Sequence, residues 1–239
     1  MGSAKEISVK VIPANIARPF VKAHHYSGKV VNNSRLHFGA FLDGKLHGVM
    51  SFGPPMDKSK VLGLVVDANG NPAPWNDMLE LNRMAFDDVL PKNSESRAIA
   101  VAVRLIRKYA PNIKWILSFA DGTQCGDGTI YRASGFKLTD IRGNKNTARL
   151  SDGSVLHKMT LESNPTQKRA DLGGVSYYDI TGGKFDFSGF CKAMKADVLE
   201  GFQLRYIKII DPQYHLSVPE LPFSAIRDRG AGMYKGEKR

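Results

Sequence analysis

Residues 78–136 read MLELNRMAFDDVLPKNSESRAIAVAVRLIRKYAPNIKWILSFADGTQCGDGTIYRASGF, and this stretch decides the fold. Its mostly apolar segment 78–86 predicts a strand. The pattern of residues 94–109 predicts a helix that ends before a proline. Residues 114–120 predict a second strand, and residues 129–136 a short helical turn. The strand–helix–strand order is long enough for a parallel crossover connection, which indicates an α/β fold.

The start of the predicted helix is the first candidate for a binding site. Asn93 or Ser94 can cap it, and its free N–H groups and partial positive charge can hold a phosphate. Ser94, Ser96 and Arg97 would add hydroxyl and guanidinium donors. An ordinary capped helix with a solvated basic face is the alternative. Asp121 is a second candidate, because functional groups gather at the carboxyl ends of parallel strands.

Composition limits the classes of protein and partner. A chain of 239 residues fits one large domain, or a core domain with an appended piece. A net charge of +11 favours a polyanionic partner, which makes nucleic acid the favoured class. Cys125 and Cys191 are the two cysteines, so no disulfide framework is expected, and reduced spectator thiols are the simplest interpretation. No apolar run is long enough to span a bilayer, and we expect a cytoplasmic protein without a membrane partner.

An unusual cluster of polar side chains, HHYSG, lies at residues 24–28. It follows a helix expected over residues 15–23, with Asn15 as the cap. His25 and Tyr26 could bind a metal or move protons. A surface loop with solvated histidines is the alternative.

The remaining elements follow from local patterns. Asp43-Gly44-Lys45 is a strong hairpin signal between two strand-like runs. The basic segment 142–153 is either a DNA-contacting hairpin or a solvated loop, and residues 163–184 suggest a linker or a loose insert. Further strands are expected at residues 6–12, 36–42, 46–53, 137–141, 155–161 and 204–210.

The last part of the chain completes these expectations. A helix is expected over residues 187–202. In the strand 204–210, Arg205 and Lys208 are expected to face outward. The glycine-containing basic tail from residue 227 is expected to be mobile unless nucleic acid orders it.

The order of elements resembles the acetyltransferase (GNAT-type) fold, a mixed central sheet flanked by helices, and IYRASGF is similar to its closing segment. A narrower resemblance is to the Mom family of phage DNA-modification proteins. It is carried by HHYSG, ELNRMAF with NSESRAIA, and SFADGTQCGDGTIYRASGF. The carboxyl-terminal phrases LPFS and RGAGMYKG add to it.

The resemblance implies an enzyme that places a carbamoylmethyl (acetamido) group on the exocyclic amino nitrogen of adenine in double-stranded DNA, which shields phage DNA from restriction. It also implies site residues. Those assigned to catalysis, and hypothetically to iron, are His25, Tyr26, Asp121 and Tyr131. Those assigned to the donor's anionic part are Arg83 and Ser96, to which the interpretation of the helix start adds Ser94 and Arg97.

The donor and the domain boundaries complete the hypothesis. LPKNSES replaces the glycine-rich pyrophosphate loop expected of coenzyme A users, so an acyl-CoA such as acetyl-CoA is one candidate donor among others. We expect a catalytic domain over residues 1–162 and an extension over residues 163–239 that is a candidate DNA contact; a homodimer is compatible with the sequence. The competing functions are a conventional acyl-CoA-dependent N-acyltransferase acting on a protein or small-molecule amine, and a non-enzymatic DNA-binding module.

Overall fold

The computed structural model describes residues 3–122, 126–234 and 237–238. Cys125, the loop thiol considered above, lies outside these residues. The chain forms two compact units that alternate along the sequence. The first contains residues 1–120, 128–140 and 204–225, and the second contains residues 121–127, 141–203 and 226–239. The separation into domains at residue 162 stays a prediction.

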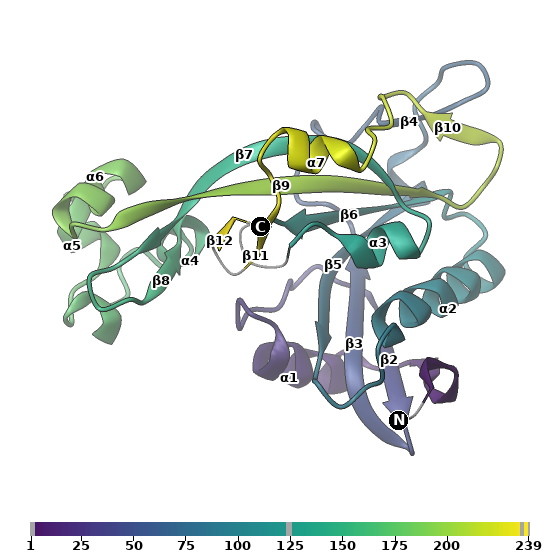
Figure 1. Cartoon of the computed structure of the whole chain (residues 1–239), viewed down its shortest axis with the longest axis horizontal. Helices are drawn as coiled ribbons and strands as arrows, with labels where there is room; N and C mark the ends of the chain where they lie inside the picture. Colours follow the sequence, from purple (N-terminus) through teal and green to yellow (C-terminus); the bar gives the residue numbers. More distant parts are fainter. Residues whose placement is uncertain (1–2, 123–125, 235–236, 239) are drawn as a thin grey trace. The chain divides into compact units, whose positions relative to one another are not determined.

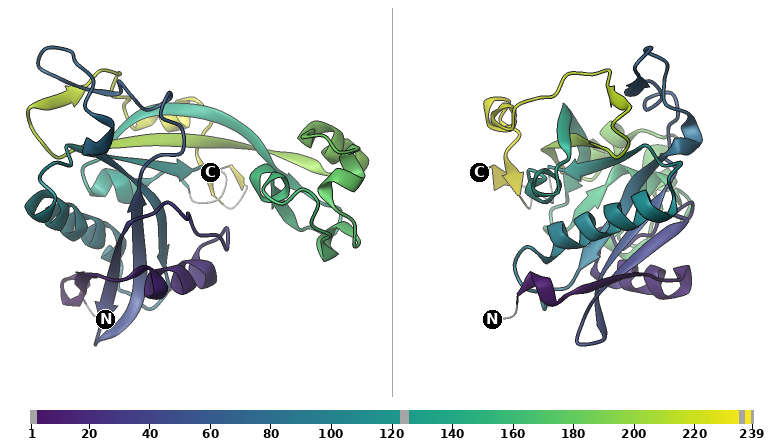
Figure 2. Two further views of the ribbon diagram at one scale, coloured as in Figure 1. Left: turned by 180° about the vertical axis from the view of Figure 1, so that it is seen from behind. Right: turned by 90° about the vertical axis from the view of Figure 1, so that its right-hand side faces the viewer.

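The first unit is built on a mixed sheet, which confirms the expected α/β class. Its strands follow the order β1-β2-β3-β5-β6-β9-β7. β1 to β5 pair antiparallel, and β5 pairs parallel with β6, as the crossover predicted. β2, β3 and β5 run side by side (Figures 1 and 2). The strands are β1 (Ser8–Val11), β2 (Leu36–Leu42), β3 (Lys45–Gly53), β5 (Met78–Phe86), β6 (Trp115–Asp121), and the parts of β7 (Lys137–Arg149) and β9 (Asp197–Ile209) that fall in this unit.

Helices cover this sheet because both of its faces are apolar. Ala17 and Val21 of α1 pack against Val49 and Ala85, which lie on one face. Met50 points to the other face and is also fully buried. The helices are α1 (Ala14–His24), α2 (Ser94–Tyr109) and α3 (Thr129–Ala133), with the 3-10 turns η1 (Ala4–Glu6) and η2 (Trp75–Asp77) and the two-stranded pair β4 (Val65–Asp67) and β10 (Tyr214–Leu216).

Local signals predicted most of these elements. Asp43 and Gly44 both have positive φ angles, 49° and 77°, as the tight hairpin turn requires, so this prediction is confirmed. The cap predicted at Asn15 was wrong, whereas Asn93 does occupy the N-cap position of α2 but makes no capping bond through its side chain. α1 begins after Pro13, and Asn93 precedes α2 in a left-handed conformation.

The prediction that Arg205 faces outward was wrong. Its side chain is only 8 % exposed. Its Nε donates to Thr139 Oγ1 at 2.9 Å, and its guanidinium lies 3.7 Å from Asp140. The neighbouring strand therefore supplies partners for a charge that the alternation of β9 alone assigns to solvent.

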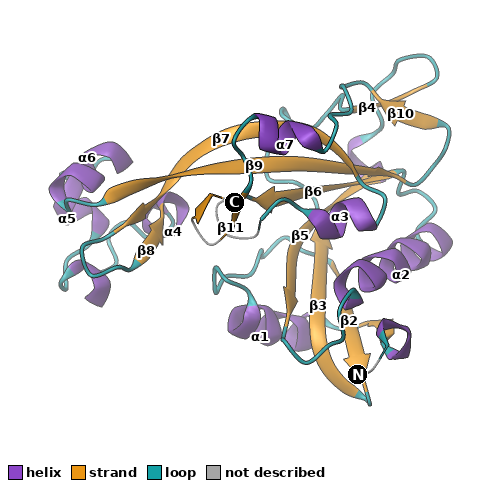
Figure 3. Ribbon diagram, viewed as in Figure 1, coloured by secondary structure: helices purple, strands orange, loops and turns teal. Residues whose placement is uncertain are grey.

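The second unit contradicts the prediction of a loose insert at residues 163–184. Leu172 and Tyr177 from this segment are buried with Phe187, Phe190 and Cys191 in one hydrophobic cluster. Cys191 is a free thiol, as expected. The helical elements of this segment and its neighbours are α4 (Lys158–Glu162), η3 (Ala170–Leu172), α5 (Tyr177–Thr181) and α6 (Phe187–Ala193), with α5 and α6 purple in Figure 3.

Strand and helix bounds in this unit also differ from the predictions. β7 continues to Arg149 and pairs with β8 (Val155–His157), so the basic segment 142–153 forms most of a hairpin rather than a loop. The expected strand 155–161 turns helical at Lys158. The helix expected over 187–202 ends at Ala193, after which Lys195 adopts a positive φ angle and β9 begins.

The carboxyl-terminal tail is more ordered near its start than expected. Ala231 is fully buried, and its N–H donates to the carbonyl of Ile226. α7 (Ser224–Asp228) precedes this contact, and the short strands β11 (Met233–Tyr234) and β12 (Glu237–Lys238) pair beyond it. No helix among the described residues combines the length and the apolar character that a membrane crossing needs.

Candidate functional site

A β-bulge in β5 creates the first part of the site. On β3, Ser51 pairs with Arg83 and Phe52 pairs with Leu81, so Asn82 is an extra residue. Without the bulge, residues 80 and 83 would point to opposite faces. With it, Glu80 and Arg83 pair with Gly53 and Ser51, two residues apart on β3, and lie on one face.

This is the face that α1 covers. Ala85, two residues after Arg83, packs against α1. α1 ends at His24 and delivers His25 and Tyr26 to the neighbourhood of Arg83. The helix and the bulged strand, far apart in sequence, therefore assemble one polar cluster, which we call the His25–Arg83 cluster: Glu80, Arg83, His25 and Tyr26.

Arg83 holds this cluster together through backbone carbonyls. Its Nε donates to the carbonyl of Lys29 at 3.0 Å, and its Nη1 donates to the carbonyl of Asn82 at 2.7 Å. Burial lowers the pKa of Arg83, and the nearby Tyr26 and Glu80 oppose this shift. Burial raises the pKa of Glu80, against a hydrogen bond from Asn82 and the charge of Arg83.

His25 is a neutral side chain in this environment. Burial and the positive charge of Arg83 lower its pKa to about 4. Its Nδ1 lies 2.8 Å from Ser27 Oγ and accepts the Ser27 N–H at 3.2 Å. The ring of Tyr26 lies 4.4 Å from the imidazole, centroid to centroid, and Tyr26 is 58 % exposed. The cluster therefore combines a guanidinium, a carboxyl group and a neutral imidazole, and it is open to solvent at Tyr26.

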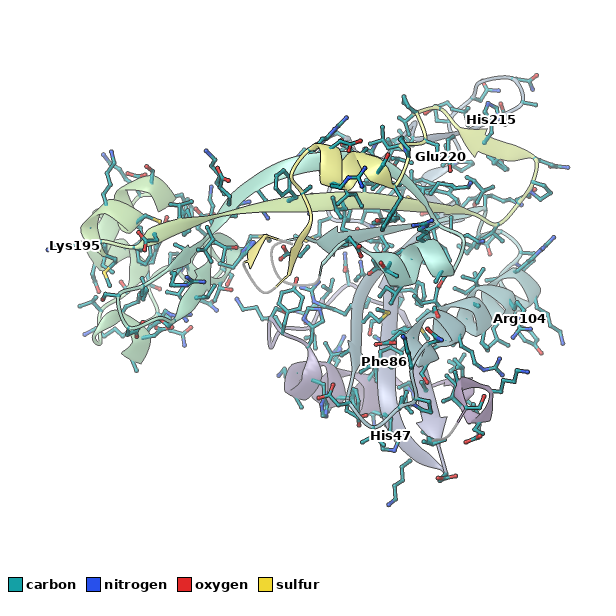
Figure 4. The ribbon with its side chains drawn as sticks, viewed as in Figure 1. His47, Phe86, Arg104, Lys195, His215 and Glu220 are labelled. Carbon is teal, nitrogen blue, oxygen red and sulfur yellow. The ribbon has the colours of Figure 1, made fainter. Side chains whose placement is uncertain are left out.

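A pocket of about 340 Å³ forms the second part of the site, at the amino end of α2. Phe86 lines it from the face of β5 opposite to Ala85, and is labelled in Figure 4. Ser96 also lines it and donates its hydroxyl to the carbonyl of Asn93 at 3.1 Å. The other lining residues are Asp87, Asp88, Leu90, Pro91, Lys92, Asn93, Glu95, Thr129, Ile130 and Ala133.

The predicted donor-binding residues divide into two groups at this pocket. Ser96 lines it, whereas Ser94 is 1 % exposed and Arg97 donates Nη2 to the carbonyl of Lys5 at 3.4 Å. Asp87 is paired with His47, whose Nδ1 lies 2.8 Å from Asp87 Oδ2. The pocket lining thus contains three carboxylates, Asp87, Asp88 and Glu95, and one lysine, Lys92, near the N–H groups at the start of α2.

The two remaining predicted residues, Tyr131 and Asp121, come from other elements of the chain. Tyr131 on α3 is buried, with its ring 5.3 Å from Tyr206 and 5.6 Å from Phe136. Asp121 ends β6 and belongs to the second unit. The structure therefore brings together His25, Tyr26 and Arg83 on one face of β5. Ser96 of α2 instead lines the pocket with Phe86, which lies on the other face of β5.

Sequence reasoning missed Glu80, Asn82 and Asp87. Glu80 carried a signal, because a carboxylate in an otherwise apolar strand requires an explanation. Asn82 carried none, since a bulge depends on the register with β3. Asp87, which lines the pocket, is paired with His47, and the sequence could not indicate this pair because the two residues are 40 positions apart.

Comparison with known proteins agrees with the early resemblance. The Mom protein family matches residues 6–225. The chain belongs to the Mom protein family. A relative, the methylcarbamoylase Mom of Escherichia phage Mu, is 36 % identical over 161 residues, which are 67 % of this chain and 64 % of that protein. The match thus spans less than two thirds of the relative's length.

Solved structures similar to this Mom-family chain are acetyltransferases. The IAA acetyltransferase of Bacillus cereus is 11 % identical, with a TM-score of 0.45, over 85 % of this chain and 99 % of that one. A Bacillus subtilis acetyltransferase in complex with CoA is 9 % identical, with a TM-score of 0.44, over 85 % and 97 %.

The hypothetical iron site does not fit the hydrogen bonds of His25. A histidine that binds a metal through Nε2 carries its proton on Nδ1. Here that proton would have to share Nδ1 with the N–H of Ser27, a donor 3.2 Å away, and Ser27 Oγ at 2.8 Å would have to accept it. Among residues 3–122, 126–234 and 237–238, no three His, Cys, Asp or Glu side chains gather in a group that could hold a metal. We therefore derive no chemical step through iron.

Proposed function

We propose that this Mom-family protein is a phage DNA-modification enzyme that adds a carbamoylmethyl group to the exocyclic amino group of adenine in double-stranded DNA. The modification would protect the DNA from host restriction in the host cytoplasm. The family match over residues 6–225 carries this proposal, because it spans every residue assigned to the site. The name of the phage Mu relative supports the reaction class and favours it over a conventional N-acyltransferase.

The proposed reaction joins the adenine nitrogen to a methylene carbon. The nitrogen loses a proton, a new N–C bond forms, and the bond from that carbon to the leaving group breaks with its electron pair. Acyl transfer would instead bond nitrogen to a carbonyl carbon and give an amide. The donor class is therefore an acetamido group activated at its methylene carbon.

We assign the chemistry to the family's motif residues. His25, Tyr26, Asp121 and Tyr131 serve the reacting groups, as hydrogen-bond donors or proton carriers. Arg83 holds an electron-rich part of the donor, since a partly buried guanidinium binds oxygen strongly. The adenine would leave the duplex to reach these side chains.

We place the rest of the donor in the pocket at the start of α2. Ser96 and the N–H groups of the helix offer hydrogen bonds to an anion. Ser94 and Arg97 are assigned here because they lie in the first turn of α2, although Ser96 is the one of the three that lines the pocket. The carboxylates of Asp88 and Glu95 oppose a highly charged pyrophosphate. An acyl-CoA donor is tested directly by the change in melting temperature on adding coenzyme A.

Double-stranded DNA is the proposed substrate, and exposed basic residues of the β7–β8 hairpin are its proposed contacts. Lys145 and Arg149 are exposed on β7, which fits contacts to phosphates. Replacing both by Gln should reduce the slope of log K against log salt concentration by roughly 2, because two fewer counterions are released. Binding titrations on a fixed duplex at several salt concentrations measure this slope. An unchanged slope would remove the hairpin from the DNA interface.

Mass spectrometry of nucleosides tests the function. Plasmid DNA from cells expressing the protein should contain deoxyadenosine heavier by one acetamido group. Asp121→Ala should abolish the product, whereas the control Asp197→Ala, which removes an exposed carboxylate of the same unit, should retain it. Unmodified DNA from folded wild-type protein would refute the proposed reaction.

A further inference from the structure

We propose that Ser27 is a positioning residue that fixes His25 as a neutral imidazole with its proton on Nε2. His25 then acts as a hydrogen-bond donor to a carbonyl or carboxamide oxygen, rather than as a metal ligand or a general base. The tautomer follows from contacts within the first unit. The identity of the accepting oxygen rests on the proposed function.

The backbone of Ser27 determines which ring nitrogen is bare. A backbone N–H can only donate, and that of Ser27 lies 3.2 Å from His25 Nδ1. This contact therefore favours the tautomer in which Nδ1 presents its lone pair. In a neutral imidazole the other nitrogen then carries the proton.

The hydroxyl of Ser27 points to the same tautomer. Ser27 Oγ accepts the N–H of Lys29 at 3.3 Å, which uses a lone pair of the oxygen. Its own proton is then available for His25 Nδ1, 2.8 Å away. The chain of donors runs from Lys29 N–H through the Ser27 hydroxyl to Nδ1, so two donors converge on this nitrogen.

The surrounding backbone keeps Ser27 in place. The N–H of His25 donates to Val21 at the end of α1, and the N–H of Gly28 donates to the carbonyl of His25. Gly28 has a φ of 60°, a conformation that favours glycine. Arg83 Nε donates to the carbonyl of Lys29 and closes the turn on β5. The backbone around His25 is thus held by hydrogen bonds to α1 before it and, through the turn that follows, to Arg83 on β5.

The opposite nitrogen of His25 is the one that can act. Nε2 makes no hydrogen bond within the part of the chain that the structure describes. Arg83 provides positive charge nearby, and Tyr26 stacks beside the ring. An N–H next to a guanidinium favours an electron-rich oxygen, such as the carboxamide oxygen of the transferred group.

Nitrogen-15 NMR of the histidine-labelled full-length protein tests the tautomer without any assay of activity. His25→Gln identifies the resonances of His25, and the exposed neighbour His24 is the internal control. We expect His25 to show a bare Nδ1 and a protonated Nε2 at neutral pH. A protonated Nδ1 in His25 would overturn the proposal.

Variants of Ser27 separate positioning from a structural role. Ser27→Ala keeps the backbone donor to Nδ1 and removes the hydroxyl donor, so the preference of His25 for a protonated Nε2 should weaken without reversing, and Ser27→Thr should restore it. If the modification assay succeeds, Ser27→Ala should lower its rate about five-fold, which corresponds to the loss of about 1 kcal/mol. A loss of folding stability with unchanged nitrogen signals would leave Ser27 a structural residue and contradict the proposal.

A metal titration provides the opposing test. Added Fe²⁺ should leave the His25 resonances as sharp as those of two control histidines, His37 and His47, which are hydrogen-bonded to Ser51 and Asp87. Selective broadening of His25 that a chelator reverses would show that it binds iron. Failure of the DNA-modification assay alone would refute the proposed function and leave the tautomer assignment standing.

Discussion

The two faces of β5 differ in what they offer a ligand. On the face toward α1, the His25–Arg83 cluster combines one guanidinium, a neutral imidazole, a phenol and the carboxyl group of Glu80. On the face toward α2, the pocket combines helix N–H groups and Ser96 with the aromatic wall of Phe86 and several carboxylates. One strand thus separates a cluster suited to an electron-rich reacting group from a cavity suited to the body of a donor.

One extra residue in β5, Asn82, determines which side chains share a face of the strand. Arg83 lies three residues before Phe86, about 10 Å along the strand. The bulge at Asn82 places Glu80 on the same face as Arg83, while the regular alternation after it places Phe86 opposite Ala85. Changes on the two faces should therefore have separable effects on the reacting group and on donor binding.

The largest effect is expected from Arg83→Met. It removes a partly buried charge and two hydrogen bonds to carbonyls, and leaves Glu80 without its cation. Hydrogen bonds to a charged group are worth up to about 3 kcal/mol, so loss of those from Arg83 to the donor should lower the rate of DNA modification by about 100-fold. The nucleoside assay measures it, with Arg104→Met on the exposed side of α2 as the control (Figure 4). Full activity of Arg83→Met would remove the cluster from the site.

Acid should destabilise the protein through His25. Its pKa falls from 6.5 to about 4 on folding, so the unfolded chain binds the proton more tightly. The stabilisation from the neutral imidazole is complete above pH 6.5 and is lost as the pH falls toward 4, by up to about 3 kcal/mol. The pKa of Glu80 is raised by burial, so its contribution to the free energy of unfolding increases, rather than decreases, as the pH falls through the range in which it titrates.

Urea denaturation at pH 7 and pH 4.5 measures this effect as a difference between wild type and His25→Gln. The difference isolates His25 from all other titrating groups. The free energy of unfolding should fall more steeply in the wild type. Equal pH dependence in the two proteins would mean that His25 keeps an ordinary pKa in the folded state.

Gly48→Ala tests the pocket face without touching the cluster. A Cβ at residue 48 would collide with the ring of Phe86, its partner across the strands. Overpacking of this kind costs about 1–3 kcal/mol and should displace the pocket wall. Thermal unfolding and donor KM should both change, whereas the nitrogen signals of His25 should not. Gly143→Ala, at a glycine with open space around it, is the matched control.

Ser34→Ala should have the smallest effect. Ser34 Oγ donates to Asn82 Oδ1 at 2.9 Å in a buried setting, and so supports the bulge. Its loss should reduce the free energy of unfolding by about 1 kcal/mol. Denaturation and the rate of modification would be measured together. A loss of stability with no change in rate would show that the bulge keeps Glu80 and Arg83 in place without this bond.

The accuracy of sequence reasoning differed between the two units for a physical reason. The hairpin at Asp43-Gly44, the strand 78–86 and the helix 94–109 depend on local turn chemistry and periodicity, which a sequence displays. Residues 163–184 are rich in glycine and polar groups, and they fold because Leu172 and Tyr177 are buried by residues more distant in the chain. Local composition does not display such burial.

The sequence by itself determined the family, the α/β class and the motif residues His25, Tyr26, Arg83 and Ser96, since these depend on residue identity and order. The tertiary structure decided which side chains surround them and which hydrogen bonds they make. Strand register placed Glu80 beside Arg83, a turn placed two donors on His25 Nδ1, and β7 placed partners around Arg205. Each of these results depends on hydrogen bonds between groups whose geometry the fold fixes.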